Sequence, residues 1–144
     1  MNANTFSLLA LTLSVAGAAH FTGCASRTVG AEAGTREFLS DVKPVLEKYC
    51  IECHNGHSAR EAGGLNLESR ELAFTTGRQA PVIQPGDPHG SLLYKVLRLG
   101  HEEVLGMPPT PERVSDEELA AVRKWIRQGA HWPAGPEGMI KLQF

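Results

Sequence analysis

The sequence Cys50-Ile51-Glu52-Cys53-His54 constrains the fold of this chain more than any other feature. Two cysteines three positions apart, followed at once by a histidine, are the attachment signature of a c-type haem. The spacing has a mechanical reason. Two thiols one helical turn apart bond the two vinyl groups on one edge of the porphyrin, and the adjacent imidazole binds the iron. The motif therefore predicts one covalent haem, held by Cys50 and Cys53, with His54 as the proximal axial ligand.

Other uses of a CxxC pair fit this sequence less well. A thioredoxin-like redox pair follows a strand in a βαβ unit, whereas a helical pattern precedes Cys50 here. A structural zinc site needs a second pair of ligands at matched spacing, and the sequence contains no other CxxC and no HxxxH. A plain disulfide leaves His54 without a role.

The composition suits a small domain that is completed by a cofactor. The 144 residues include 15 glycines and 9 prolines with only 6% aromatic residues, which predicts a loop-rich fold with a thin apolar core. The formal net charge is −2 and the sequence has no basic run, so nucleic acid is not expected as a partner.

The apolar pattern predicts an all-α fold, because spacings of three and four residues recur and no alternating stretch of useful length is present. A helix is expected from residue 38 into Cys50, with its apolar residues on one face. Ser40 or Asp41 is expected to cap its start. Pro44 then falls in the first turn, where a missing N–H costs no intrahelical bond.

Three further helices are expected. About two turns are predicted between residues 68 and 76, and a helix opened by Asp87-Pro88 is predicted to stop near Gly100. The last helix is the best marked, because Ser115 and Glu118 form a capping box at its start and Gly129 follows its end.

The first part of the chain differs from the rest in composition. Residues 6–18 are apolar, uncharged and too short for a permanent membrane span, which is typical of an export signal. Phe21-Thr22-Gly23-Cys24 resembles the lipobox of bacterial lipoproteins, although Phe21 replaces leucine and no Lys or Arg precedes residue 6. We predict that residues 1–23 are an export signal and that Cys24 is a candidate site of lipidation. The protein is then expected in the periplasm or cell envelope. The alternatives are an ordinary cleaved signal that ends near Ala19 and a misassigned start.

The remaining boundaries follow from local composition. Residues 24–35 are small and polar without periodicity and are predicted to form a flexible tether. The folded domain is expected over residues 36–133, and residues 134–144 are expected to form a C-terminal tail.

Met107 is the predicted distal axial ligand. It lies in Gly106-Met107-Pro108-Pro109, far enough beyond His54 for the chain to return over the opposite face of the haem. The two prolines limit the entropy lost in holding the loop. A lone methionine more often fills a core, but this one belongs to a proline-rich loop rather than an apolar helix face. His101 would instead give bis-histidine ligation, and His57 is too close to His54 to reach the other face.

Taken in order, the haem motif and five further segments resemble the planctomycete-type cytochrome c domain. These segments are Gly63-Gly64-Leu65, Pro85-Gly86-Asp87-Pro88, Ser91-Leu92-Leu93, Met107-Pro108-Pro109 and Trp125-Ile126-Arg127-Gln128-Gly129-Ala130. The resemblance runs from about residue 37 to residue 133, and Asn55 departs from it because glycine commonly follows the haem histidine. It implies a small class I-like cytochrome c fold packed around the haem, with His54 and Met107 as axial ligands.

Eight side chains are expected in the apolar pocket, namely Tyr49, Leu65, Leu67, Leu92, Leu93, Val96, Trp125 and Ile126. Arginines are also candidate partners of the haem propionates. The candidates are Arg78, Arg98 and Arg113, but most arginines are solvated, so the sequence singles out none of the three.

The expected function is outer-sphere electron transfer with protein redox partners, not an enzymatic reaction. The alternative is a haem sensor or peroxidase-like protein whose sixth ligand leaves the iron. A third interpretation is a haem subunit of a dehydrogenase complex. Contact with a membrane is expected only through a lipid on Cys24.

Overall fold

The computed structural model of the chain describes residues 25–79 and 81–143. Five α-helices, one π-helical turn and one 3-10 helix make up the regular structure, and none of the described residues belongs to a strand. The prediction of an all-α fold is therefore confirmed. No helix in these two ranges is both long enough and apolar enough to cross a membrane. The predicted export signal and Cys24 lie outside the described residues.

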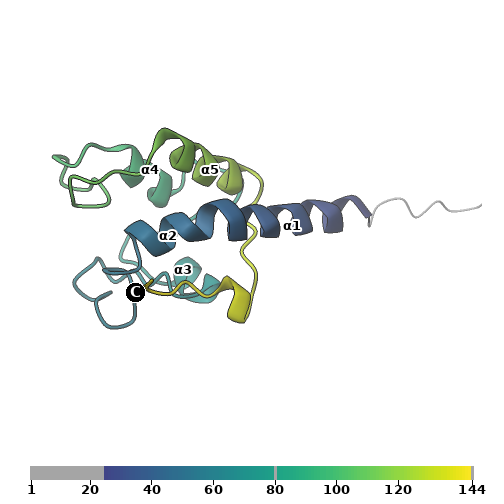
Figure 1. Ribbon diagram of the computed structural model, residues 1–144, viewed down its shortest axis with the longest axis horizontal. Helices are drawn as coiled ribbons and strands as arrows, with labels where there is room; N and C mark the ends of the chain where they lie inside the picture. Colours follow the sequence, from purple (N-terminus) through teal and green to yellow (C-terminus); the bar gives the residue numbers. More distant parts are fainter. Residues whose placement is uncertain (1–24, 80, 144) are drawn as a thin grey trace, which may run out of the picture.

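Three consecutive helical segments form one long rod at the N-terminal side of the domain (Figure 1). They are α1 (Ala25–Glu37), the π-helical turn η1 (Phe38–Val42) and α2 (Lys43–Tyr49). In η1 the N–H of Lys43 donates to the carbonyl of Phe38, five residues earlier. This wider turn accommodates Pro44, which has no N–H and whose ring would clash with a carbonyl in a regular α-helix.

Two predictions for this region are wrong. Ser40 and Asp41 do not cap a helix start, because α1 continues directly into η1 and no side chain caps η1 or α2. Residues 25–35, predicted to be a flexible tether, are helical. Packing holds the end of this helix, since Gly34 is buried against His131 and a side chain on Gly34 would collide with the imidazole.

The core lies where α5 (Asp116–Arg127) packs against η1. Phe38 and Trp125 are fully buried there with ring centroids 5.6 Å apart, and Trp132 packs on Phe38 at 4.5 Å. The indole N–H of Trp125 donates to the carbonyl of His131 at 3.0 Å. Aromatic pairs add about 0.5–1.5 kcal/mol each to the gain from burial, so this cluster fixes the crossing of the two helices.

The helices α3 (Arg70–Thr75) and α5 form where the pattern predicts them. The Ser69 hydroxyl caps α3 by accepting a hydrogen bond from the N–H of Leu72. The predicted capping box of α5 is present: the Ser115 hydroxyl accepts from the N–H of Glu118, and the Glu118 carboxylate accepts from the N–H of Ser115. Such caps satisfy N–H groups that the first helical turn leaves free.

The helix α4 (Leu92–Arg98) begins later than predicted. The Asp87 carboxylate accepts a hydrogen bond from the N–H of Gly90 at 2.9 Å, which closes a tight turn ahead of the helix. The buried hydroxyl of Ser91 donates to the carbonyl of Asp87 at 2.9 Å and ties the turn to the helix start. Asp87-Pro88 therefore opens a turn, and the helix follows it.

The segment 134–143, predicted to be a separate tail, packs on the domain. It contains the 3-10 helix η2 (Pro136–Gly138), whose last carbonyl accepts a hydrogen bond from the indole N–H of Trp132 at 2.7 Å. Ile140 is only 2% exposed, and its N–H donates to the carbonyl of Glu68 at 3.0 Å. Because the side chain of Ile140 is buried and its backbone bonds to Glu68, these residues belong to the folded domain.

Candidate functional site

The segment that carries both cysteines and the adjacent histidine is a tight turn at the end of α2. The N–H groups of Cys50 and Ile51 both donate to the carbonyl of Leu46, at 3.1 and 3.0 Å. The N–H groups of Cys53 and His54 then donate to the carbonyl of Cys50, at 3.2 and 2.9 Å. The two thiols, both free, and the imidazole therefore leave the backbone within about one helical turn.

Asn55, which follows His54 where glycine is common in the family, forms hydrogen bonds with the backbone before it and after it. Its amide group donates to the carbonyls of Ile51 (2.8 Å) and Glu52 (2.9 Å). Its carbonyl oxygen accepts from the N–H groups of His57 (2.8 Å) and Ser58 (3.1 Å). Asparagine favours turns because its side chain can bond the neighbouring backbone, so it supports this turn where glycine is more common.

A cavity of about 680 Å³ lies beside the turn. Its volume falls within the range of about 300–1,000 Å³ that is usual for small-molecule and cofactor sites. Cys50, Cys53 and His54 line it together with Met107, so the structure brings the four predicted haem-binding side chains to one space. Most of the other lining residues are apolar: Leu65, Leu67, Val82, Leu92, Leu93, Val96, Leu97, Leu105 and Pro109.

Burial shifts the pKa of two groups in this cavity. It raises the pKa of the Cys50 thiol to about 12, so the sulfur is held as a neutral thiol. It lowers the pKa of His54, an effect that the backbone of Leu65 partly opposes. The buried Nδ1 of His54 has no hydrogen-bond partner of good geometry among the described residues. His54 is therefore neutral at pH 7, the form in which an imidazole binds a metal ion.

Met107 lies in the loop between α4 and α5, and the loop turns tightly just before it. The N–H of Met107 donates to the carbonyl of Val96 at 3.0 Å, which attaches the loop to α4 beside the cavity. Gly106 is buried, and a Cβ on it would collide with the carbonyl oxygen of Gly100. Only glycine fits at this position. The pattern Gly-Met-Pro-Pro marks the loop in the sequence but does not predict this close approach.

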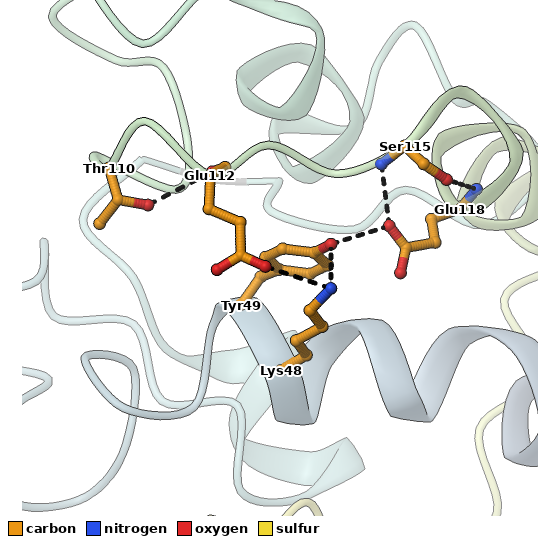
Figure 2. Close-up of polar contacts among 6 residues, drawn as sticks. All are labelled: Lys48, Tyr49, Thr110, Glu112, Ser115 and Glu118. Atoms are coloured by element: carbon orange, nitrogen blue, oxygen red, sulfur yellow. Dashed lines mark hydrogen bonds and ion pairs between the residues drawn. The ribbon is translucent and has the colours of Figure 1, made fainter.

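The same loop is joined to the end of α2 by the polar contacts drawn in Figure 2. The Tyr49 hydroxyl donates to Oε2 of Glu118 at 3.1 Å and accepts a hydrogen bond from Nζ of Lys48 at 2.7 Å. Lys48 also pairs with Glu112 at 3.2 Å, and Glu118 belongs to the capping box of α5. Because Tyr49 lines the cavity, these contacts link the cavity wall to the Met107 loop and to α5.

Some sequence predictions about the pocket are wrong. Trp125 and Ile126 do not line the cavity, because α5 packs this face into the core, where Trp125 contacts Phe38. His101 is exposed and pairs with Glu102 at 3.5 Å. Neither of the histidines weighed against Met107 as axial ligand, His57 and His101, lines the cavity.

The residues around the cavity fit a covalently bound haem. Two thiols one turn apart, an adjacent neutral imidazole and a methionine sulfur are the donor set of a c-type haem site. An apolar wall with few polar groups is the usual lining of a site for a large flat cofactor.

Comparison with known proteins agrees with this fit. Residues 50–111 match the family model described as Planctomycete cytochrome C. The matched region starts at Cys50 and ends beyond Met107, so it includes all four predicted haem-binding residues. A cytochrome c domain is a carrier of electrons with a covalently attached haem, and this is the class of function that the match implies for residues 50–111. No curated protein and no solved structure shows significant similarity to the chain.

Proposed function

Since residues 50–111 belong to the Planctomycete cytochrome C family, we propose that the protein is an exported monohaem c-type cytochrome that transfers single electrons, with the iron held by His54 and Met107. One observation carries this proposal. The cysteine turn and the Met107 loop, which are far apart in the sequence, line the same cavity. The sequence has a single CxxCH motif, which supports a single haem.

Four side chains would hold the cofactor. Cys50 and Cys53 would carry the two thioether bonds, and His54 and Met107 would supply the axial nitrogen and sulfur. The bound haem supplies the redox chemistry, which is the gain and loss of one electron at its iron. A methionine sulfur in the sixth position closes the iron to small ligands and raises the reduction potential, as suits a carrier.

The other residues around the cavity would keep water out and hold the four donors in place. The apolar lining lowers the local dielectric, which favours the less charged state of a buried redox centre. Cys50 is 8% exposed whereas Cys53 is exposed, so the site reaches the protein surface at Cys53. We expect a partner protein to dock near this opening and to exchange an electron without any bond of a substrate being made or broken.

The N-terminal part of the proposal is export, with Cys24 as a lipid attachment site. Cytochrome c domains are typically extracytoplasmic, which supports this assignment. Fractionation of cells that express the full chain tests it, with labelled palmitate to detect the lipid. Export predicts haem-bearing protein in the periplasmic or membrane fraction. Attachment of a lipid to Cys24 predicts that the Cys24→Ser variant carries no labelled palmitate and leaves the membrane fraction. Haem-free protein confined to the cytoplasm contradicts export.

Spectra of the full chain, expressed with a c-type cytochrome maturation system, test the ligation. We expect a low-spin, six-coordinate iron, a methionine–iron charge-transfer band in the oxidised protein, and no reaction of the reduced protein with carbon monoxide. Met107→Ala should lose the band and bind carbon monoxide. A band that survives in Met107→Ala rules out Met107 as the ligand. Ready binding of carbon monoxide by the wild type instead supports the sensor or peroxidase-like alternative.

A further inference from the structure

Arg113 makes an unusual set of contacts with the loop that carries Met107. Its Nη1 donates to the carbonyl of Pro108, the residue directly after Met107, at 2.6 Å. Its Nη2 donates to the carbonyl of Leu99 at 2.5 Å and, more weakly, to that of Leu97 at 3.5 Å. One guanidinium therefore bridges the end of α4 and the chain beside Met107.

The acceptors on α4 are carbonyls that the helix itself leaves free. The last turn of an α-helix has carbonyl groups without intrahelical partners, and a cation there also interacts favourably with the helix dipole. Leu97 lies in this last turn and Leu99 follows it directly. The guanidinium of Arg113 therefore donates both to free carbonyls at the end of α4 and to a carbonyl in the Met107 loop.

The surroundings of Arg113 argue against pairing with a haem propionate. Arg113 is half-buried and is not among the residues that line the cavity. Both terminal nitrogens already donate to carbonyls, and no ion pair joins Arg113 to an acidic residue in the described ranges. The planar guanidinium provides several donors in a fixed geometry, which a lysine ammonium does not reproduce.

We propose that Arg113 is a positioning residue for the sixth ligand: it clamps the Met107 loop to α4 and thereby keeps the methionine sulfur on the iron. This inference rests on the proposed His54/Met107 ligation. Without the clamp, the bond from the N–H of Met107 to the carbonyl of Val96 still joins the ligand residue to α4, but the chain directly after Met107 loses its bond to Arg113. The sulfur should then leave the iron more often, and an added ligand should take its place more easily.

Imidazole binding to the oxidised, haem-loaded full chain measures this exchange directly. Arg113→Gln should bind imidazole about 10- to 100-fold more tightly than the wild type, the usual size of an effect from a residue that orients a metal ligand. Its methionine–iron band should weaken. Arg113→Lys keeps the charge but cannot span the two carbonyls, so its imidazole affinity should also rise.

Two control variants separate positioning from general stability. Arg123→Gln removes an exposed arginine of α5 that has no hydrogen bond or ion pair with the described residues. Ser69→Ala removes the N-cap of α3, away from the Met107 loop. Both should keep the wild-type imidazole affinity, even though Ser69→Ala lowers the midpoint of thermal unfolding.

Each outcome decides a separate point. A wild type without the methionine–iron band overturns the His/Met ligation and this inference with it. A wild type with the band, together with Arg113→Gln of unchanged imidazole affinity, overturns the role of Arg113 alone. If Arg113→Gln only lowers the unfolding midpoint, as Ser69→Ala does, its role is structural. An Arg113→Lys variant that matches the wild type shows that charge, not bridging, is what matters.

Discussion

The two sides of the cavity are built by different kinds of contact. On the cysteine side, the backbone bonds within the turn join residues at most five positions apart, such as Ile51 and Leu46, and one longer bond runs from the N–H of Leu67 to the carbonyl of His54. On the methionine side, Met107 is held through Val96, and its loop is joined to α2 by the Lys48–Glu112 pair, which spans 64 positions. The cysteine turn is thus mainly a local structure, whereas the methionine side depends mainly on tertiary packing.

This difference predicts that the two sides respond differently to substitution. Changes in the cysteine turn should abolish attachment of the haem, so that no haem signal remains on the chain. Changes in the tertiary contacts should loosen the methionine side while the haem stays attached.

Removal of both thiols should have the most complete effect. In Cys50→Ala/Cys53→Ala no thioether can form, so we expect no haem to remain on the chain in a denaturing gel stained for haem. Met107→Ala is the matched control and should stain like the wild type, because its haem is still attached on the cysteine side. Haem that stays bound to the double variant under denaturing conditions would contradict the attachment proposed for this turn.

Truncation of the main core residue should destabilise the whole domain. Trp125 is fully buried against Phe38, so Trp125→Ala leaves a large cavity and should lower the free energy of unfolding by about 3–5 kcal/mol. Denaturant titration followed by circular dichroism measures this loss. The methionine–iron band should disappear at a lower denaturant concentration than the circular dichroism signal of the helices. If the two signals change together, the methionine side is not the weaker one.

Gly106→Ala should act on the methionine side alone. Its Cβ would collide with the carbonyl oxygen of Gly100, so the loop has to move. Forcing a methyl group into a packed site typically costs about 1–3 kcal/mol, and we also expect a weaker methionine–iron band. Gly100→Ala is the control, since a Cβ there meets nothing within 4 Å. Equal spectra for both variants would show that the close approach does not hold the ligand.

Tyr49→Phe should have the smallest effect. It removes the hydroxyl that joins α2 to Glu118 and should lower the free energy of unfolding by about 1 kcal/mol, because the site is only partly buried. Thermal unfolding of the haem-loaded protein measures the change. Tyr94→Phe is the control, since the Tyr94 hydroxyl forms no hydrogen bond with another described residue. A loss no larger than that of Tyr94→Phe would mean that the hydrogen bonds of the Tyr49 hydroxyl drawn in Figure 2 add nothing to stability.

The same contrast explains which features could be predicted from the sequence. The cysteine turn and the capping box of Ser115 depend on residues a few positions apart, so a short pattern is enough to identify them. The pattern Gly-Met-Pro-Pro identifies Met107 as a candidate ligand. The contacts of Arg113 and the close approach of Gly106 to Gly100 depend instead on the tertiary fold. No local pattern encodes them.

Periodicity also failed in a specific way. It identified Trp125 as buried but could not say whether its face meets the cavity or the core, and the structure places it in the core. Residues 25–35 have no apolar periodicity, yet they are helical because they continue into η1 and because Gly34 packs on His131. In both cases the residue that covers the buried position lies far away in the sequence: Phe38 packs on Trp125, and His131 packs on Gly34.

The rod of α1, η1 and α2 has a mechanical consequence for a carrier that is fixed at its N-terminal side. Residues 25–49 form a helical rod about 37 Å long at 1.5 Å per residue, and it ends directly at Cys50. A flexible linker would let the redox centre sample every orientation near its anchor. A stiff helical spacer instead fixes the distance of the redox centre from the anchor and restricts its orientation. Partner proteins at that distance and in that orientation could reach the exposed Cys53, whereas other partners could not.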